Sequence, residues 1–179
     1  MTALLDQITG FFGSIGLQYS EGPIEGQTFL PGLAIERGSL AFDRASLKFP
    51  GDLLHEAGHL AVMCQARRRT AHRSVGKFAA EELAAIAWSY AAVVHLGLAP
   101  AVVFHPHGYK GGSDALIENF TNGQTMGVPL LQWLGMSAEP RRAAELGVAP
   151  YPAMIHWLNE SGEDIVTARK RTAKATDHL

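Results

Sequence analysis

Two histidines spaced four apart, with a glutamate beside the first, place the strongest constraint on what this chain can form. The segment His55-Glu56-Ala57-Gly58-His59 follows Pro50-Gly51, and apolar residues recur through it at helical spacing. Residues i and i+4 lie on one face of an α-helix, so both imidazoles can reach a single tetrahedral zinc ion. We therefore expect a zinc-binding helix from Asp52 to about Gln65, capped by the Asp52 carboxylate.

The opposite face of this predicted helix is apolar and suited to a protein core. Its members are Leu53, Leu54, Ala57, Leu60, Ala61 and Cys64. We expect Cys64 to pack there as a small hydrophobic residue and not to bind metal. Since it is the one cysteine in the chain, an internal disulfide is excluded.

Length and composition describe a chain that is able to bury one sizeable core. Its 179 residues are 47% hydrophobic and 18% charged, with 15 Lys and Arg against 17 Asp and Glu. A single domain over residues 1–179 is therefore expected, and the near-neutral balance argues against nucleic acid as a partner. The first residues predict neither a secretory signal nor a membrane span. We expect a cytoplasmic protein with no membrane partner.

Apolar periodicity and turn residues predict the remaining elements. An amphipathic N-terminal helix precedes a β-hairpin over 33–42, which turns at Arg37-Gly38-Ser39. A helix over 79–96 and three or four short helices follow, the last from Asp164 to Leu179. The basic stretch from Arg67 to Lys77 is interpreted as a solvated loop. The expected fold class is α+β, with a small antiparallel sheet or hairpin before the zinc-binding helix and a mainly helical remainder.

The histidine motif resembles the active-site helix of the zincin metallopeptidases, whose signature is H-E-x-x-H. In the metzincin branch a glycine and a third histidine follow, at positions where this chain has Val62 and Gln65. The resemblance is therefore to a short, gluzincin-like type. It implies a third zinc ligand from a glutamate on the following helix, and Glu81 and Glu82 stand at the start of that helix.

Only one of these two glutamates is able to face the metal, because consecutive helical residues point about 100° apart. Glu82 aligns with a stripe of small residues, Ala85, Ser89 and Ala92, which would let the two helices approach closely. Glu81 instead stands opposite the larger residues Leu83, Ile86 and Tyr90. We expect Glu82 to be the ligand, and Glu81 is the alternative.

Zinc held by two histidines and a glutamate keeps a fourth position for water, which is the arrangement of a catalytic site. Glu56 is then the expected general base. Donors to the oxyanion of the tetrahedral intermediate are expected from His105 and Tyr109. The predicted reaction is hydrolysis of a peptide bond. The resemblance implies that a peptide or protein substrate aligns along the edge strand of the hairpin.

Two alternatives fit the same residues. In the first, zinc pins two helices together in a non-catalytic regulatory or protein-interaction module, although such a site needs no base like Glu56. In the second, the hydrolase acts on a substrate other than a peptide. The motif indicates an activated water and leaves the bond that it attacks open.

Overall fold

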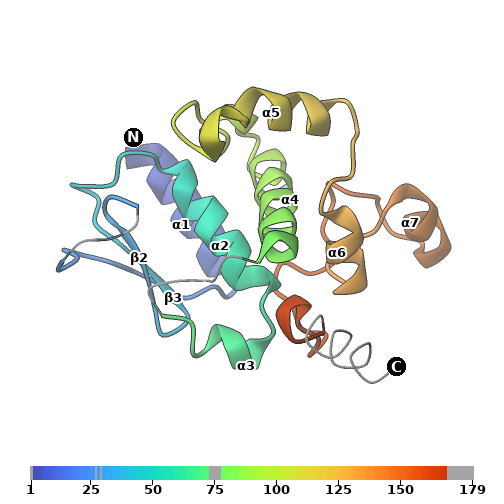
Figure 1. Ribbon diagram of the computed structural model, residues 1–179, viewed down its shortest axis with the longest axis horizontal. Coiled ribbons are helices and arrows are strands. Elements are labelled where there is room, and N and C mark those ends of the chain that lie inside the picture. Colours follow the sequence, from blue (N-terminus) through green and yellow to red (C-terminus); the bar gives the residue numbers. More distant parts are fainter. Residues whose placement is uncertain (1, 27, 29, 73–77, 169–179) are drawn as a thin grey trace, which may run out of the picture.

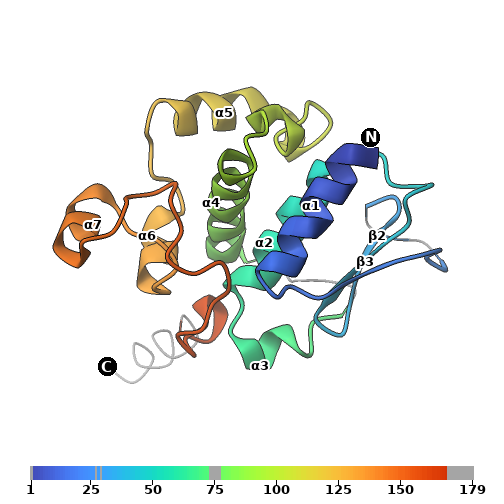
Figure 2. The ribbon, with the colours of Figure 1, turned by 180° about the vertical axis from the view of Figure 1, so that it is seen from behind.

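Two helices packed against each other form the centre of the molecule. They are α2 (Gly51–Val62) and α4 (Ala79–His95), as the ribbon shows (Figure 1). The view from behind shows α1 (Thr2–Ser14) lying over α2 (Figure 2). The computed structural model describes residues 2–26, 28, 30–72 and 78–168.

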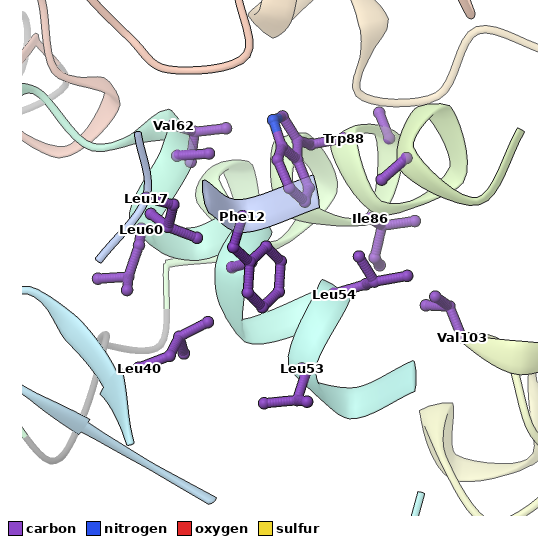
Figure 3. Packing of buried hydrophobic residues seen from close by; sticks show 14 of the residues in the cluster. Phe12, Leu17, Leu40, Leu53, Leu54, Leu60, Val62, Ile86, Trp88 and Val103 are labelled. Atoms are coloured by element: carbon purple, nitrogen blue, oxygen red, sulfur yellow. The ribbon is translucent and has the colours of Figure 1, made fainter. Parts of the chain in front are cut away.

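One hydrophobic cluster fills the space between these helices and the sheet (Figure 3). Phe12 from α1, Leu54 from α2 and Trp88 from α4 are fully buried in it. The predicted apolar face of α2 is confirmed for five of its residues, Leu53, Leu54, Ala57, Leu60 and Ala61. Cys64 is the exception, because it follows the end of α2 and is partly exposed instead of packed in the core.

In the described residues a three-stranded mixed sheet lies beside α2. β2 (Leu33–Glu36) and β3 (Ser39–Phe42) form the predicted hairpin, and β1 (Tyr19–Glu21) pairs with β3 in parallel. Arg37 and Gly38 have φ values of 51° and 81°, the positive angles that a tight two-residue hairpin turn requires. The parallel β1 departs from the antiparallel expectation. All three of its residues are exposed, so no alternating pattern marks it in the sequence.

The N-terminal end of α2 differs from the prediction. The helix starts at Gly51, with Pro50 in the capping position and no side-chain cap. Asp52 was expected to provide that cap, but it lies inside the first turn, where its carboxylate is 2.9 Å from Nε2 of His105. A Cβ at position 51 would lie 1.8 Å from the main-chain oxygen of Val102. Glycine is therefore required where the start of α2 meets this neighbouring segment.

The C-terminal end of α2 is held by donors from other segments. Arg68 donates to three main-chain carbonyl oxygens there, those of Leu60, Ala61 and Met63. The Asn159 amide donates to the carbonyl oxygen of Val62 at 2.9 Å. These carbonyls have no partner within the helix, and a cation beside them is favoured by the helix dipole. The helix therefore ends at Val62, earlier than the predicted Gln65.

The basic stretch after α2 is not the solvated loop that its charge predicts. Its first two residues, Arg67 and Arg68, lie in α3 (Gln65–Arg68). Arg67 contacts the carboxylates of Glu81 and Asp164. Residues 73–77 of this stretch lie outside the described part of the chain. The first of its arginines are thus tied into the fold by acceptors that are distant in the sequence.

The prediction for α4 is confirmed, with its end one residue earlier than expected. Short helices follow it along the chain, namely η1 (Pro100–Val102), η2 (Tyr109–Gly111), α5 (Ser113–Thr121), α6 (Val128–Trp133) and α7 (Pro140–Leu146). Residues 165–168 of the last predicted helix are helical, and 169–179 lie outside the described part. The mainly helical α+β fold is therefore confirmed. No helix among the described residues has both the length and the apolar character that a membrane crossing requires.

Candidate metal centre

Three potential metal ligands converge where α2 and α4 meet. Nε2 of His55 and Nε2 of His59 lie 3.3 Å apart. The Glu82 carboxylate places one oxygen 3.4 Å from Nε2 of His55 and the other 3.1 Å from Nε2 of His59. The His59 side chain is 4% exposed, whereas that of Glu82 is 45% exposed. This group is able to hold a metal ion, and it opens to solvent on the side of Glu82.

The packing of α4 on α2 brings Glu82, and not Glu81, to the two histidines. Ala85 and Ser89, about one and two turns after the glutamates, are fully buried and face Gly58 of α2. Small residues at a contact allow two helices to approach closely. The stripe of small residues on α4 therefore lies in the helix contact, and Glu82 continues this stripe to the metal-ligand group.

Glu81 lies behind His59. Its Oε1 is 3.6 Å from Nδ1 of His59, and its Oε2 contacts the guanidinium of Arg67. Among the described residues, Oε1 of Glu81 and Nδ1 of His59 are buried and have no hydrogen-bond partner. A histidine that binds metal through one nitrogen usually donates the proton on the other to an acceptor such as a carboxylate. Glu81 is thus placed to support His59 and not to be a ligand.

Burial and charge divide the two histidines into a neutral and a protonated one. Burial, assisted by the charge of His59, lowers the pKa of His55 to about 4. Burial also acts to lower the pKa of His59, but contacts with Glu81 and Glu82 and the charge of Glu56 outweigh it and raise this pKa to about 9. The hydrogen bond from His59 lowers the pKa of Glu82. Near neutral pH the group therefore carries a proton on His59, which a metal ion has to displace.

Glu56 follows His55 on α2 and belongs to the same electrostatic group. Burial raises its pKa; the charge of His59 opposes this effect, and those of Glu82 and Asp52 add to it. A carboxyl group whose pKa is shifted toward neutrality is suited to accept and return a proton near pH 7. The role of Glu56 as general base stays a prediction, and its raised pKa is consistent with that role.

Tyr109 approaches the ligand group from η2. Its hydroxyl oxygen lies 3.0 Å from Nδ1 of His55, the ring nitrogen that faces away from the other ligands. Tyr109 and Lys110 have φ values of 53° and 51°, a backbone conformation that is uncommon outside glycine and occurs at functional sites. Burial and the charges of three nearby carboxylates raise the pKa of the phenol, so it stays protonated. Tyr109 can thus accept the Nδ1–H of His55 and still donate its own proton elsewhere.

His105 is engaged by Asp52 at the first turn of α2. Its Nε2 is 2.9 Å from Oδ1 of Asp52, and its ring stacks on Phe49 with centroids 4.0 Å apart. Of the two residues expected to stabilise an oxyanion, the structure brings Tyr109 to the ligand group and holds His105 against Asp52. The oxyanion role stays a prediction for both.

Two residues in the contacts around Glu81 were not identified from the sequence. Arg67, assigned there to a solvated loop, contacts Glu81, which lies 14 residues further along the chain. Asp164, expected only to begin the last helix, binds Arg67 from 97 residues away. No local pattern indicates such contacts, because each depends on how distant segments fold together.

The arrangement can hold a metal ion and exchange a proton beside it. It combines two imidazoles with a solvent-accessible carboxylate, next to a carboxyl group of raised pKa. Comparison with models of protein families, with curated proteins and with solved structures found no match for this chain.

Proposed function

We propose that the protein is a zinc-dependent metallopeptidase of the zincin type, in which His55, His59 and Glu82 hold the metal. The observation that carries the proposal is the spacing of the donor atoms. The two Nε2 atoms lie 3.3 Å apart, and the two oxygens of the Glu82 carboxylate lie 3.4 Å from Nε2 of His55 and 3.1 Å from Nε2 of His59. Nitrogen and oxygen ligands at about 2.0–2.2 Å from a tetrahedral zinc ion stand about 3.3–3.6 Å from one another. The three side chains therefore need little movement to bind zinc.

The kind of ligand supports zinc over other common ions. Two imidazoles with one carboxylate are typical of catalytic zinc sites, whereas calcium and magnesium favour sites made of oxygen ligands. Three protein ligands with exposure at Glu82 also keep a position for water, which a closed structural site lacks. This favours catalysis over a non-catalytic module.

Different residues around the metal ligands would serve different steps of hydrolysis. When bound, zinc polarises the substrate carbonyl and lowers the pKa of a coordinated water. Glu56 would accept a proton from the attacking water and pass it to the leaving amine. Tyr109 orients His55 through Nδ1, and it reaches the substrate oxygen only if its hydroxyl leaves this contact. One water is consumed, and the products are a carboxylic acid and an amine.

The sheet offers a place for an extended peptide. β2 lies at one edge of the order β1-β3-β2, and an edge strand can pair with a peptide through main-chain hydrogen bonds. We infer that the substrate is a peptide or protein segment that adds to this edge, and that it reaches the metal from the exposed side of Glu82.

Digestion of a peptide library by the zinc-loaded protein tests the proposal. We expect the wild type to cleave peptides and Glu56→Gln, which retains all three ligands, to lower the rate by about 10²–10⁴-fold. Glu160→Gln is a matched control, because the Glu160 side chain is 74% exposed, and its rate should equal that of the wild type. Undiminished cleavage by Glu56→Gln would contradict the proposed role of the base.

The same digestion distinguishes the alternatives. A zinc-loaded wild type that cleaves no peptide but hydrolyses other esters or amides would indicate a different substrate class. A protein that binds zinc, hydrolyses nothing and captures a partner would be the non-catalytic module. Either result would overturn the peptidase assignment.

A further inference from the structure

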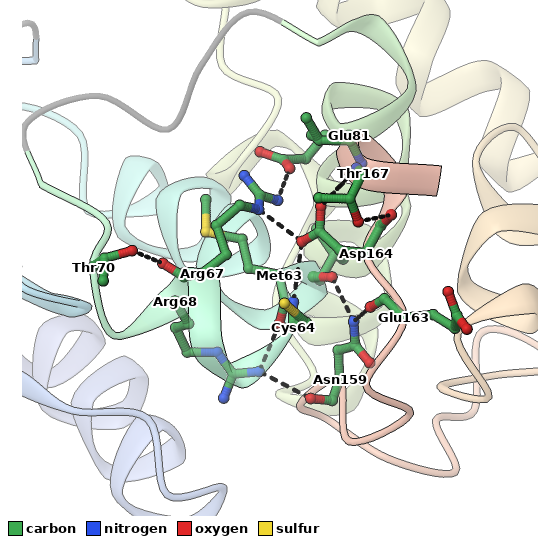
Figure 4. A network of polar contacts seen from close by, with 12 residues as sticks. Met63, Cys64, Arg67, Arg68, Thr70, Glu81, Asn159, Glu163, Asp164 and Thr167 are labelled. Atoms are coloured by element: carbon green, nitrogen blue, oxygen red, sulfur yellow. Dashed lines mark hydrogen bonds and ion pairs between the residues drawn. The ribbon is translucent and has the colours of Figure 1, made fainter. Parts of the chain in front are cut away.

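A row of charged side chains leads from Asp164 at the C-terminal turn through Arg67 to Glu81 (Figure 4), and from there to His59. Oδ2 of Asp164 lies 2.7 Å from Nε of Arg67. A terminal nitrogen of the same guanidinium contacts Oε2 of Glu81. Oε1 of Glu81 then faces Nδ1 of His59 at 3.6 Å. Four side chains, from the start of the C-terminal turn, α3, α4 and α2, therefore contact one another in a row. The row ends at His59, a proposed zinc ligand.

Asp164 begins the C-terminal turn, residues 165–168. Its Oδ1 accepts the main-chain N–H groups of Val166 and Thr167 at 3.1 and 3.2 Å, which is the arrangement of a helix cap. Its Oδ2 accepts from Arg67. A single carboxylate thus holds the C-terminal turn and Arg67 together, so that Arg67 keeps this contact only while the turn is docked.

Burial makes the members of this row depend on one another. The side chains of Asp164 and Glu81 are 2% and 1% exposed, and a buried carboxylate without a partner is strongly unfavourable. Arg67 contacts one carboxylate through Nε and the other through a terminal nitrogen. A guanidinium has this forked set of donors, whereas the ammonium of lysine is a single point charge.

The two atoms at the end of the row lack other partners. Among the described residues, Oε1 of Glu81 and Nδ1 of His59 are buried without a hydrogen bond, and they face each other. When His59 binds a metal through Nε2, its proton is on Nδ1 and needs an acceptor. Arg67 holds Oε2 of Glu81, which leaves Oε1 as that acceptor.

We infer that Arg67 and Asp164 are positioning residues for the metal centre, and that they make metal affinity depend on docking of the C-terminal turn. The inference rests on the proposed function, because it takes His59 as a metal ligand. Docking of the turn holds Arg67, Arg67 holds Glu81, and Glu81 fixes the orientation of the His59 ring. By linkage, metal binding stabilises the docked turn to the same extent.

Zinc dissociation constants, measured by chelator competition at a temperature where circular dichroism shows every variant folded, test the inference. Loss of a supporting residue of this kind weakens metal binding by about 10–100-fold, which we expect for Glu81→Gln and for Asp164→Asn. The double variant should bind no more weakly than Glu81→Gln alone, since both act through the same contact. Asp114→Asn is the matched control, because Asp114 is exposed, and its affinity should equal that of the wild type.

Arg67→Lys separates charge from geometry in the same assay. If the forked contact matters, lysine should weaken zinc binding nearly as much as Asp164→Asn does. The visible spectrum of the cobalt-substituted protein reports ligand geometry. It should change in Arg67→Lys and in Asp164→Asn. The inference would be overturned if Glu81→Gln and Asp164→Asn fold, bind zinc as tightly as the wild type and keep its cobalt spectrum, and differ only in a lower melting temperature. This result would leave the proposed function intact.

Hydrogen exchange on the wild type needs no variant. The main-chain N–H groups of Val166 and Thr167 donate hydrogen bonds to Asp164. If zinc binding and docking of the C-terminal turn are linked, zinc should slow hydrogen exchange at these two amides. Zinc binding with unchanged exchange at both amides would contradict the linkage. A wild type that binds no zinc would instead contradict the proposed function itself.

Discussion

Gly58 lies directly against the main chain of Ala85. A Cβ at position 58 would be 2.8 Å from the Ala85 carbonyl oxygen and 3.2 Å from its Cα. The motif on α2 therefore has no room for a side chain at the point where α4 crosses it. This contact brings the start of α4, with Glu82, within reach of His55 and His59.

Gly58→Ala should separate the two helices. The added methyl group meets main-chain atoms that cannot move alone, so we expect a loss of about 1–3 kcal/mol in the free energy of unfolding and weaker zinc binding. Urea unfolding and chelator competition measure the two effects. Gly10→Ala in α1 is the control, since nothing lies within 4 Å of a Cβ there and alanine favours a helix. Equal stability of Gly58→Ala and wild type would show that the close approach is not required.

Tyr109→Phe removes the acceptor of the Nδ1–H of His55. We expect zinc to bind about tenfold more weakly, as for other losses of support around a metal ligand. Chelator competition measures this change, and Tyr19→Phe, at an exposed position of β1, is its control. A lower hydrolytic rate at unchanged zinc affinity would show instead that Tyr109 acts on the substrate alone.

The pH dependence of zinc affinity follows from the two histidines. With the pKa of His55 lowered to about 4 and that of His59 raised to about 9, one histidine proton has to leave between these values. Affinity should therefore rise about tenfold per pH unit from pH 5 to pH 6.5, below the pH at which zinc-bound water ionises. Titration with a chelator of known pH dependence measures the slope. A rise approaching a hundredfold per unit near pH 5 would mean that both histidines are protonated there.

Arg68→Met should destabilise the end of α2. The guanidinium donates to the carbonyl oxygens of Leu60, Ala61 and Met63, and leaving partly buried acceptors unpaired costs about 1–3 kcal/mol. Urea unfolding should show a loss in this range. Arg69→Met, at an exposed position, is the matched control and should stay near the wild-type value. A loss no greater than that of the control would mean that water replaces these donors.

The parts of the fold that were predictable are those set by local periodicity. The spacing of Leu53, Leu54, Ala57 and Leu60 predicts the buried face of α2, and the Gly-containing turn at Arg37-Gly38 predicts the hairpin with its bounds. Within the site, the small residues Ala85 and Ser89 indicate which face of α4 meets α2. That periodicity alone favours Glu82 over Glu81 as the residue beside the histidines.

What could not be predicted depends on partners that are distant in the sequence. Asp52 has the chemistry of a helix cap, but His105, 53 residues away, engages its carboxylate. Arg67 has the sequence context of a solvated charge, yet Asp164 and Glu81 bind it in the folded chain. In each case a contact with a distant residue overrides the local preference, and neither composition nor residue spacing predicts that contact.

Metal analysis of the purified protein tests the metal site most directly. After loading with zinc and removal of the excess, we expect about one zinc ion per chain in the wild type. The variant with both His55→Ala and His59→Ala should hold none. His156→Ala, whose side chain is 53% exposed, should equal the wild type. Zinc retained undiminished after replacement of both His55 and His59 would contradict the site.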